Sequence, residues 1–171
     1  MEMKILLTGA TGGIGLAILH RLNPQKHKFV CVAHADIETN EEFDWMICAH
    51  GVLDETDVYE TFHANVISNI YLAEEIKAKN IIFISSTSGV KGNDKYPVYS
   101  ASKAALNMYA KLKGYYVICP GPTDTPMFKK LGITDIKPQS PDEVAKVVEK
   151  IINGEIKSKL IIIRNGEINY G

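Results

Sequence analysis

The chain has 171 residues, of which 46 % are hydrophobic and 23 % are charged, and its 19 basic and 20 acidic residues leave a net charge of −1. A folded chain of this length buries roughly two thirds of its unfolded surface, so these values predict one globular domain over residues 1–171 and argue against a disordered protein. The basic residues are scattered, which gives no sign of a nucleic-acid partner or of an anionic membrane surface.

The sequence also gives no sign of export or membrane insertion. No apolar run approaches the roughly 20 residues that span a bilayer, and the N-terminus reaches Thr8-Gly9 too early for a secretory signal peptide. The three cysteines form no CxxC pair and are expected to be small apolar residues in a reducing compartment. These features together predict a cytoplasmic protein.

Short apolar runs alternate with segments of helical periodicity along the chain. The predicted strands are residues 4–7, 29–33, 45–48, 81–85, 115–119 and 160–163. Helices are predicted over residues 13–22, 98–111 and 141–153, a mostly helical stretch over 56–79, and an irregular proline-rich segment over 120–138. Strands that alternate with helices pair in parallel, so the pattern predicts a doubly wound α/β fold of the Rossmann type, with helices on both faces of the sheet.

A glycine-rich turn, TGATGGIG at residues 8–15, follows the first strand and opens the first helix. Glycine permits positive φ and a close approach of the backbone, and a helix N-terminus attracts a pyrophosphate. This position favours a dinucleotide site over a turn without a ligand. The glycines fit both TGxxxGxG, through Gly9, Gly13 and Gly15, and GxxGxxG, through Gly9, Gly12 and Gly15. The turn alone does not decide between the two.

A second candidate site joins the start of the helix over 98–111 to the end of the strand over 81–85. Tyr99 and Lys103 lie one helical turn apart on the same face. A nearby ammonium favours the phenolate, so Lys103 is expected to lower the pKa of Tyr99 and to make it a usable general acid/base near neutral pH. Ser86 precedes Tyr99 by 13 residues and follows the strand, at the sheet edge where open α/β proteins bind ligands.

With these residues in place, the segment over 82–103 resembles the active-site segment of the short-chain dehydrogenase/reductase family, through ISSTSG at 84–89 and YSASKAAL at 99–106. The Ser–Tyr spacing is similar to that of the usual short type, not the extended, epimerase-like branch, and so decides between the two glycine patterns. The resemblance continues at 48–51, where CAHG stands for the family's NNAG, at Asn65, and at 120–125, where PGPTDT is similar to PGxxxT. The matching motifs run in order over residues 4–163.

The resemblance implies an NAD(P)(H)-dependent oxidoreductase that interconverts a carbonyl and a primary or secondary alcohol. Tyr99 would exchange the proton with the substrate oxygen, Ser86 would orient that oxygen, and Lys103 would lower the pKa of Tyr99 and bind the nicotinamide ribose. Asn65 would hold a water of a proton relay. Thr125 would bind the nicotinamide carboxamide, and the cofactor is expected to contact Gly9, Thr11, Gly12, Gly13, Ile14, Gly15, Ala33, His34, Ala49, His50, Gly51, Pro120, Gly121, Thr123 and Thr125.

The choice of cofactor depends on the end of the second strand. An acidic residue there would bind the ribose hydroxyls of NAD, whereas a basic residue nearby would accept the phosphate of NADP. Ala33 followed by His34 resembles the NADP users, although Asp36 could serve NAD if the alignment slips. We therefore favour NADP(H). The remaining histidines show no metal-ligand spacing, so no metal is expected.

The chain is an unusually short member by this comparison. Between residues 36 and 44 there is no room for the family's helix, edge strand and second helix, so the edge strand is lost or residues 35–38 are its remnant. We expect six strands. The segments 65–86 and 99–120, which carry the helices that pair relatives into dimers or tetramers, and the lid after Pro126 also look short. An open site then implies broad substrate tolerance or completion by a partner subunit, and the resemblance implies a homodimer or homotetramer.

Two other functions compete with the carbonyl reductase. The first is a non-catalytic NADP(H)-binding regulatory or sensor module on the same fold; such relatives often lose the tyrosine or the lysine, and this chain keeps both. The second is a sugar-nucleotide epimerase or dehydratase. The length of the chain, the Ser–Tyr spacing and the missing C-terminal substrate domain count against it.

Overall fold

A computed structural model describes residues 1–33 and 37–171, and its centre is a seven-stranded sheet in the order β2-β1-β3-β4-β5-β6-β7. The first six strands pair in parallel, and β7 adds an antiparallel edge next to β6. The strands are β1 (Lys4–Thr8), β2 (Lys28–Val32), β3 (Phe43–Cys48), β4 (Ala78–Ile84), β5 (Tyr116–Pro120), β6 (Leu160–Arg164) and β7 (Glu167–Tyr170).

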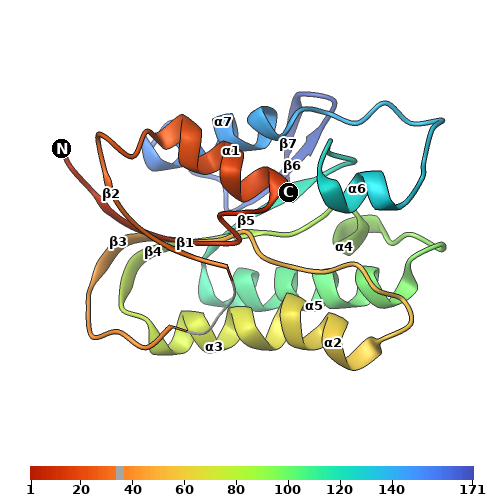
Figure 1. Ribbon diagram of the computed structural model, residues 1–171, viewed down its shortest axis with the longest axis horizontal. Coiled ribbons are helices and arrows are strands. Elements are labelled where there is room, and N and C mark those ends of the chain that lie inside the picture. Colours follow the sequence, from red (N-terminus) through yellow and green to blue (C-terminus); the bar gives the residue numbers. More distant parts are fainter. Residues whose placement is uncertain (34–36) are drawn as a thin grey trace.

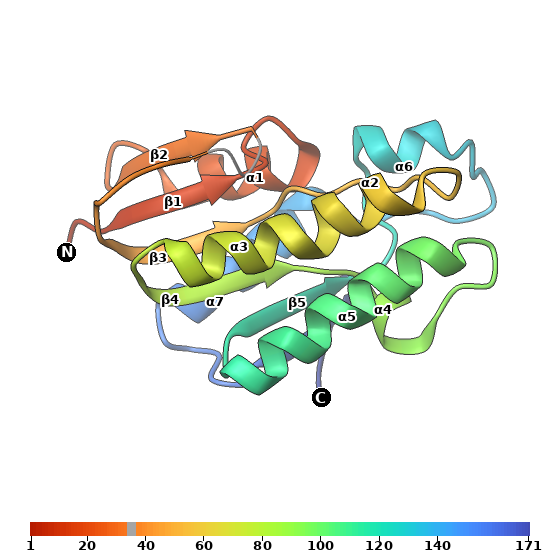
Figure 2. The ribbon, with the colours of Figure 1, turned by 90° about the horizontal axis from the view of Figure 1, so that it is seen from below.

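The helices cover both faces of this sheet (Figure 1). One layer holds α1 (Gly13–Leu22) and α7 (Pro141–Ile152); the opposite layer, seen in front of the strands in Figure 2, holds α2 (Val58–Phe62), α3 (Ser68–Glu75) and α5 (Pro97–Lys113). A π-helical turn (His63–Ile67) joins α2 to α3, and the short helices α4 (Ser88–Lys91) and α6 (Pro126–Lys130) lie beyond the strand ends. The predicted doubly wound α/β fold is confirmed.

Each strand contributes to both hydrophobic layers because successive side chains point to opposite faces. In β1, Ile5 and Leu7 pack in the cluster formed with α1 and α7, whereas Leu6 packs in the cluster formed with α3 and α5. All three are fully buried. The continuous apolar runs of the sequence therefore reflect strands that are covered on both sides, as expected for a parallel sheet.

The prediction of six strands was wrong by one. The six predicted strands are β1–β6, and the seventh, β7, forms a hairpin with β6 through Asn165 and Gly166, whose φ angles are 50° and 77°. Two consecutive residues with positive φ make the tight turn that fits the twist of a hairpin, and Asn-Gly is its usual sequence.

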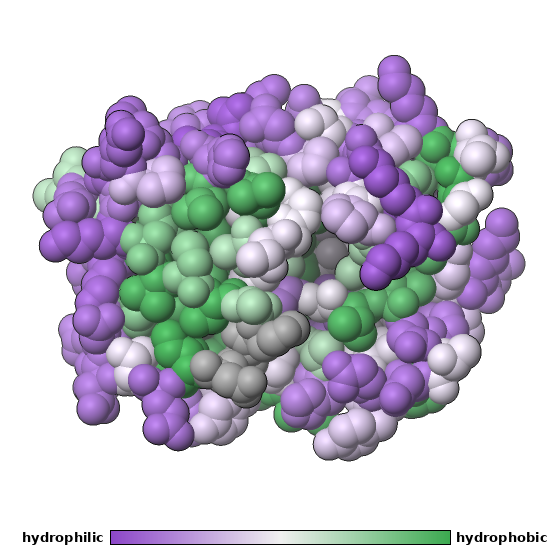
Figure 3. Space-filling view, viewed as in Figure 1, coloured by the Kyte–Doolittle hydropathy of each residue, from purple (hydrophilic) through white to green (hydrophobic). Residues whose placement is uncertain are grey.

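Among the described residues, no strand pairs with the outer side of β2. Phe29, Val30 and Val32 remain only partly buried along this edge. Figure 3, seen from the side of Figure 1, shows apolar side chains gathered over it. Residues 35–38 as a possible remnant strand lie partly outside the described residues; Ile37 and Glu38 are in no strand.

The stretch predicted as mostly helical over 56–79 is divided. Asp57 caps α2 by accepting a hydrogen bond from the Glu60 N–H at 2.8 Å. The π-helical turn then interrupts the α-helical ladder at Asn65, and α3 ends at Glu75, so that Ala78 pairs with Phe43 in the sheet. The irregular segment over 120–138 also contains α6, capped by Thr125. None of the described helices is long and apolar enough to cross a membrane.

Candidate active site

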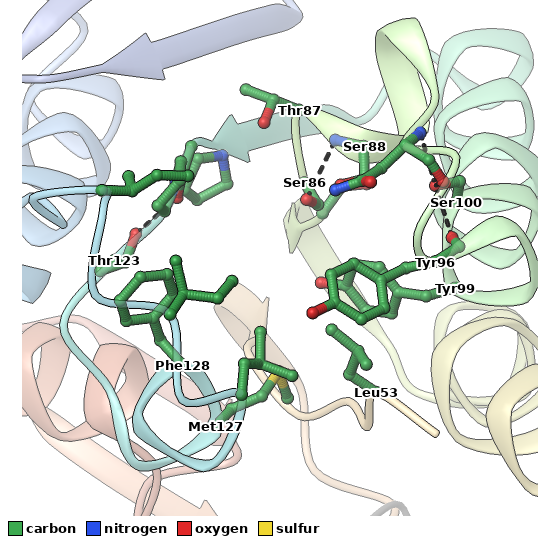
Figure 4. Close-up of a pocket in the computed structure, with 18 of the residues that line it drawn as sticks. Leu53, Ser86, Thr87, Ser88, Tyr96, Tyr99, Ser100, Thr123, Met127 and Phe128 are labelled. Atoms are coloured by element: carbon green, nitrogen blue, oxygen red, sulfur yellow. Dashed lines mark hydrogen bonds between the residues drawn. The ribbon is translucent and has the colours of Figure 1, made fainter. Parts of the chain in front are cut away.

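Two cavities lie side by side at the C-terminal ends of the parallel strands. The smaller, about 310 Å³, runs from the glycine-rich turn past the loop after β3 to Lys103. The larger, about 830 Å³, lies between the first turns of α4 and α5 and the segment after β5 (Figure 4). Both are lined by Ile14, Ser85, Tyr99, Thr125 and Met127. A ligand in one cavity would therefore meet a ligand in the other beside Tyr99.

The glycine turn has the shape of a backbone cradle. Gly9 has a φ of +66°, and a Cβ placed on it would lie 2.7 Å from the backbone carbon of Ala49. A Cβ on Gly13 would lie 2.7 Å from Cγ2 of Thr125, and Gly15 packs directly against Gly9. At the N-cap of α1, Gly12 offers no side-chain acceptor to the first turn. The free N–H groups of that turn and the room above the glycines fit a pyrophosphate.

Most of the predicted cofactor contacts lie along the small cavity. Its lining includes Gly9, Thr11, Gly12, Gly13, Ile14, Ala33, Ala49, His50, Gly51 and Thr125. Gly15 is buried behind the turn, so it shapes the cradle and does not line it. Pro120, Gly121 and Thr123 line the large cavity. The predicted contact at His34 lies outside the described residues.

His50 ties the loop after β3 to two other elements. Its Nδ1 lies 2.6 Å from Oγ1 of Thr8 at the end of β1, and its Nε2 lies 2.8 Å from Oγ of Ser68 on α3. The Thr8 hydroxyl also accepts the N–H of Ala49 at 3.2 Å. The chain lacks the asparagines of the family's NNAG motif, and the His50 imidazole bridges β1 and α3 at this place.

The predicted pair of Tyr99 and Lys103 meets at the junction of the two cavities. The first two turns of α5 carry both residues; Tyr99 is 9 % exposed and Lys103 is 4 % exposed. The Lys103 Nζ donates to the carbonyl oxygen of Ile84 at 3.3 Å and lies 5.7 Å from the centroid of the Tyr99 ring. Ser86 lies opposite, where its Oγ accepts the N–H of Ser88 at 3.1 Å. The structure brings these three predicted residues together.

The expected electrostatics of the pair were wrong. Burial raises the pKa of Tyr99 to about 12, and the contact with the Ser86 hydroxyl opposes this only in part. Burial also lowers the pKa of Lys103 to about 8. Both effects follow from the loss of water around a charged group. Lys103 does not lower the pKa of Tyr99 here, because its ammonium faces the ring and the Ile84 carbonyl and makes no hydrogen bond with the phenol.

Asn65 lies behind the cavities and lines neither. It is fully buried in the π-helical turn. Its Oδ1 accepts the N–H of Val52 at 2.8 Å, and its Nδ2 donates to the carbonyl of Val52 at 2.8 Å and to Oγ of Ser102 at 3.0 Å. The side chain therefore fastens the loop after β3 to α5. A direct contact with a catalytic water stays a prediction.

The segment after β5 forms the far wall of both cavities. The Thr123 hydroxyl donates to the carbonyl of Gly121 at 2.9 Å, and buried Gln139 donates to the same hydroxyl at 3.3 Å. Thr125 is 9 % exposed and accepts the N–H of Phe128 at 3.2 Å, which caps α6. These bonds hold Thr125 over the glycine turn, within reach of Gly13.

Sequence reasoning missed four residues around Tyr99. Leu53, Met127 and Phe128 form an apolar wall of the large cavity, facing the two tyrosine rings in Figure 4. Glu55 accepts two backbone N–H groups at the start of α5, including that of Tyr99. No motif pointed to Leu53 or Glu55, because their contacts join segments far apart in the chain; an acidic loop directly after the CAHG segment was the signal there. Met127 and Phe128 lie in the segment after Pro126, which the sequence indicated only as a short lid.

Comparisons with known proteins agree with this geometry. A family model described as short chain dehydrogenase matches residues 41–135, more than half of the chain. Among solved structures, a short chain dehydrogenase family protein from Francisella tularensis is 20 % identical, with a TM-score of 0.76 over 97 % of this chain and 98 % of its own. No curated protein matches the sequence.

Two further solved structures share the fold. The ligand-free aldohexose dehydrogenase of Thermoplasma acidophilum is 16 % identical, with a TM-score of 0.79 over 96 % of this chain and 93 % of its own. A 4-hydroxyisoleucine dehydrogenase complexed with NADH is 17 % identical, with a TM-score of 0.76 over 95 % and 97 %. At these identities the structures show the common fold and carry no information about the substrate.

Proposed function

Because this chain belongs to the short-chain dehydrogenase family, whose members are NAD(P)-dependent oxidoreductases acting on CH–OH and carbonyl groups, we propose that it interconverts a small carbonyl compound and the corresponding alcohol, with Tyr99 as general acid and base. The observation that carries the proposal is the position of Tyr99, which lines both cavities, between Lys103 on the small cavity and Ser86 on the large one. A cofactor in the small cavity and a carbonyl in the large one would both lie beside Tyr99.

In the direction of reduction, the phenol of Tyr99 gives its proton to the carbonyl oxygen as that oxygen gains negative charge. The Ser86 hydroxyl donates a hydrogen bond to the same oxygen and stabilises the developing charge. A nicotinamide held by the residues of the small cavity would supply the hydride. In oxidation Tyr99 takes the proton back from the alcohol. Lys103 would bind the nicotinamide ribose through its ammonium.

The residues of the small cavity fit a dinucleotide, and we propose NADP(H) as the preferred one. Gly9, Gly12 and Gly13 would hold the pyrophosphate against the N-terminus of α1. Ala33, exposed just after β2 and part of the cavity lining, leaves room for a ribose phosphate where an acidic side chain would repel it. Thr125 would bind the carboxamide.

The large cavity supports a substrate with an apolar body. Its wall after β5 is formed by Met127, Phe128, Leu131, Ile133 and Ile136. A volume of about 830 Å³ is at the upper end of ordinary small-molecule sites. This wall is short, with α6 spanning only five residues, and broad tolerance of carbonyl substrates is part of the proposal.

The same proposal includes one domain over residues 1–171, a cytoplasmic location and assembly into a homodimer or homotetramer. The assembly is supported by large apolar side chains that are exposed on α3 and α5 and on the turn before α3, namely Ile67, Tyr71, Met108 and Leu112. The location is supported by three free cysteines.

A sensor module that binds NADP(H) without catalysis is the second candidate. It is favoured by the raised pKa of Tyr99, about 12, which keeps the phenol protonated, so that little phenolate is present to act as a base at neutral pH. The presence of both Tyr99 and Lys103 supports the enzyme, and so does the adjoining large cavity.

Fluorescence titration with NADPH and NADH, followed by turnover of a panel of small and bulky ketones and aldehydes, tests the proposal. We expect tighter binding of NADPH and turnover that falls by about 10²–10⁴-fold in Tyr99→Phe. The control is Tyr109→Phe on the same helix, which loses only a hydrogen bond to Glu74. Binding of either nucleotide without turnover of any carbonyl would favour the sensor instead.

A further inference from the structure

The N-terminus of α5 is closed by a carboxylate from a distant loop. Its N-cap residue, Tyr96, makes no side-chain capping bond. Instead, Glu55 Oε2 accepts the N–H of Val98 at 2.9 Å, and Glu55 Oε1 accepts the N–H of Tyr99 at 2.8 Å. Both N–H groups belong to the first turn of α5, where backbone N–H groups have no hydrogen-bond partner inside the helix. The carboxylate also faces the positive end of the helix dipole, so both bonds are charge-assisted.

Glu55 comes from a loop that is itself anchored. Three residues earlier, Val52 is held through both its N–H and its carbonyl by the buried amide of Asn65. One residue earlier, the carbonyl of Asp54 accepts the hydroxyl of buried Thr61 at 2.6 Å. The backbone next to Glu55 is therefore fixed in position. Because its carboxylate makes two hydrogen bonds to the first turn of α5, it sets both the distance and the orientation of that turn relative to the loop.

We propose that Glu55 is a positioning residue that holds the first turn of α5, and with it the Tyr99 hydroxyl, at the junction of the two cavities. The inference rests on the proposed role of Tyr99 as acid and base. A backbone N–H and a side chain of the same residue move together, so a shift of the first turn carries the phenol away from Ser86. Leu53, two residues before Glu55, lines the large cavity, so the same anchored loop shapes the wall next to Tyr99.

Asp57 provides a matched control within the same loop. Its carboxylate accepts the N–H of Glu60 three residues later and caps α2, the helix that it begins. Asp57→Ala removes an acidic cap of the same kind without a bond to α5. Glu55→Ala removes a cap that joins distant segments, because Glu55 precedes Val98 by 43 residues and Tyr99 by 44. A general loss of helix stability would affect both variants, whereas a positioning role affects only Glu55.

The test uses Glu55→Ala, Glu55→Gln and Asp57→Ala in the full chain, with hydrogen exchange of individual amides, cofactor titration and steady-state kinetics. In Glu55→Ala we expect the protection of the Val98 and Tyr99 amides to fall by about tenfold or more, the loss of a charge-assisted bond. The kcat should fall by about tenfold as well, while the Kd of NADPH changes by less than about twofold. Glu55→Gln keeps one amide oxygen as an acceptor, so it should restore part of both losses. Asp57→Ala should leave kcat and the Val98 and Tyr99 amides unchanged.

Unchanged protection of Val98 and Tyr99 in Glu55→Ala would overturn the inference, and so would lost protection with an unchanged kcat. An equal fall of kcat in Asp57→Ala would show that Glu55 acts only as an ordinary stabilising cap, and this would overturn the inference as well. The proposed function fails in a different way, through a wild-type protein that reduces no carbonyl or a Tyr99→Phe variant as active as wild type. In that case the amide protection still decides whether Glu55 fixes the first turn of α5.

Discussion

The N-termini of α1 and α5 both point to the candidate site, and the chain treats them in opposite ways. At α1 the N-cap is Gly12, with no capping side chain and no acidic residue in the first turn. At α5 the carboxylate of Glu55 occupies the two first-turn N–H groups of Val98 and Tyr99. An open N-terminus can bind the phosphate of a ligand, whereas a closed one holds a side chain in place. The N-terminus of α1 thus lies where a cofactor would bind, and the N-terminus of α5 lies where the proposed acid and base, Tyr99, is held.

The two helices also differ in where side-chain bonds to neighbouring elements hold them. In the last turn of α1, Arg21 makes two hydrogen bonds to Asp142, at 2.8 and 2.7 Å, and one to Glu149 at 3.0 Å, both on α7. This contact fixes α1 without using its N-terminus. α5 is held near its C-terminus by Tyr109 and Lys113, which bind Glu74 of α3, and in addition at its N-terminus by Glu55, next to Tyr99. Substitutions at the two helices are therefore expected to have different effects.

The largest effect is expected from Gly9→Ala, which changes the glycine-rich turn directly before the uncapped N-terminus of α1. Gly9 has a φ of +66°, and its new Cβ would lie 2.7 Å from the backbone of Ala49 and His50. Strain at positive φ together with the backbone clash should lower the free energy of unfolding by roughly 3 kcal/mol and abolish cofactor binding. Gly132→Ala is the matched control, because Gly132 has a φ of +64° with nothing within 4 Å of the new Cβ. Equal losses in the two variants, measured by urea unfolding, would show that the cradle is not close-packed.

The second largest effect is expected from Lys103→Met, which removes the buried ammonium next to Tyr99. The pKa of Lys103 is about 8 in the folded protein, against an ordinary value of 10.5. Between these two pH values the unfolded chain holds more protons, so the free energy of unfolding rises with pH there; below pH 8 the penalty for burying the charge is constant. Lys103→Met removes this penalty. It should raise the free energy of unfolding at pH 7 by roughly 2–3 kcal/mol, and this gain should vanish by about pH 10.5.

Urea unfolding between pH 7 and 10.5 measures that gain without any assay of activity. The exposed Lys111→Met, on the same helix, serves as control and should show no such dependence. A constant difference between Lys103→Met and wild type over this range would mean that Lys103 keeps its ordinary pKa. The electrostatics of the Tyr99 pair would then have to be revised.

A smaller effect is expected when the open N-terminus is closed by design. Gly12 has a φ of −80°, which any residue adopts, and a Cβ there meets only the Gly9 carbonyl oxygen at 3.3 Å. In Gly12→Asp the new carboxylate would cap α1 and repel a pyrophosphate, so the Kd of NADPH should rise by about tenfold, or about 1.4 kcal/mol, without loss of stability. Gly12→Ala adds the Cβ alone. If it weakens binding as much as Gly12→Asp, steric contact and not charge controls this position.

The smallest effect is expected at the other end of α1. Hydrogen bonds from Arg21 hold the pKa of the partly exposed Asp142 below its ordinary value. A lowered pKa stabilises the fold above the range where the unfolded carboxyl titrates, and this contribution is lost as the pH falls through the folded pKa. Asp142→Asn should cost about 0.5–1 kcal/mol at pH 7, and this cost should shrink progressively as the pH falls below the ordinary carboxyl range, measured by thermal unfolding. A cost that does not change with pH would point to packing and not to charge.

The site residues that can be predicted from the sequence without reference to a family are those whose spacing is local. The glycine turn at 8–15 and the pair Tyr99–Lys103 each lie within one turn or one helix, so their residues predict their own arrangement. Glu55 and the bond between Asn65 and Val52 depend on contacts across the fold, and no periodicity reports them. The pKa of Tyr99 was predicted in the wrong direction because the pattern YxxxK carries no information about burial. By contrast, β7 had a local signal in Asn165-Gly166 that was not used.

The most direct test of the proposed reaction follows deuterium from NADPH or NADH that carries deuterium at both C4 positions into the product of a carbonyl substrate, by mass spectrometry. We expect one deuterium on the carbinol carbon for each cofactor oxidised, at a rate that falls sharply in Tyr99→Phe and not in Tyr109→Phe. Bound cofactor with no deuterium in any product, across the whole panel of carbonyls, would contradict the claim and leave a nucleotide-binding module on the same fold.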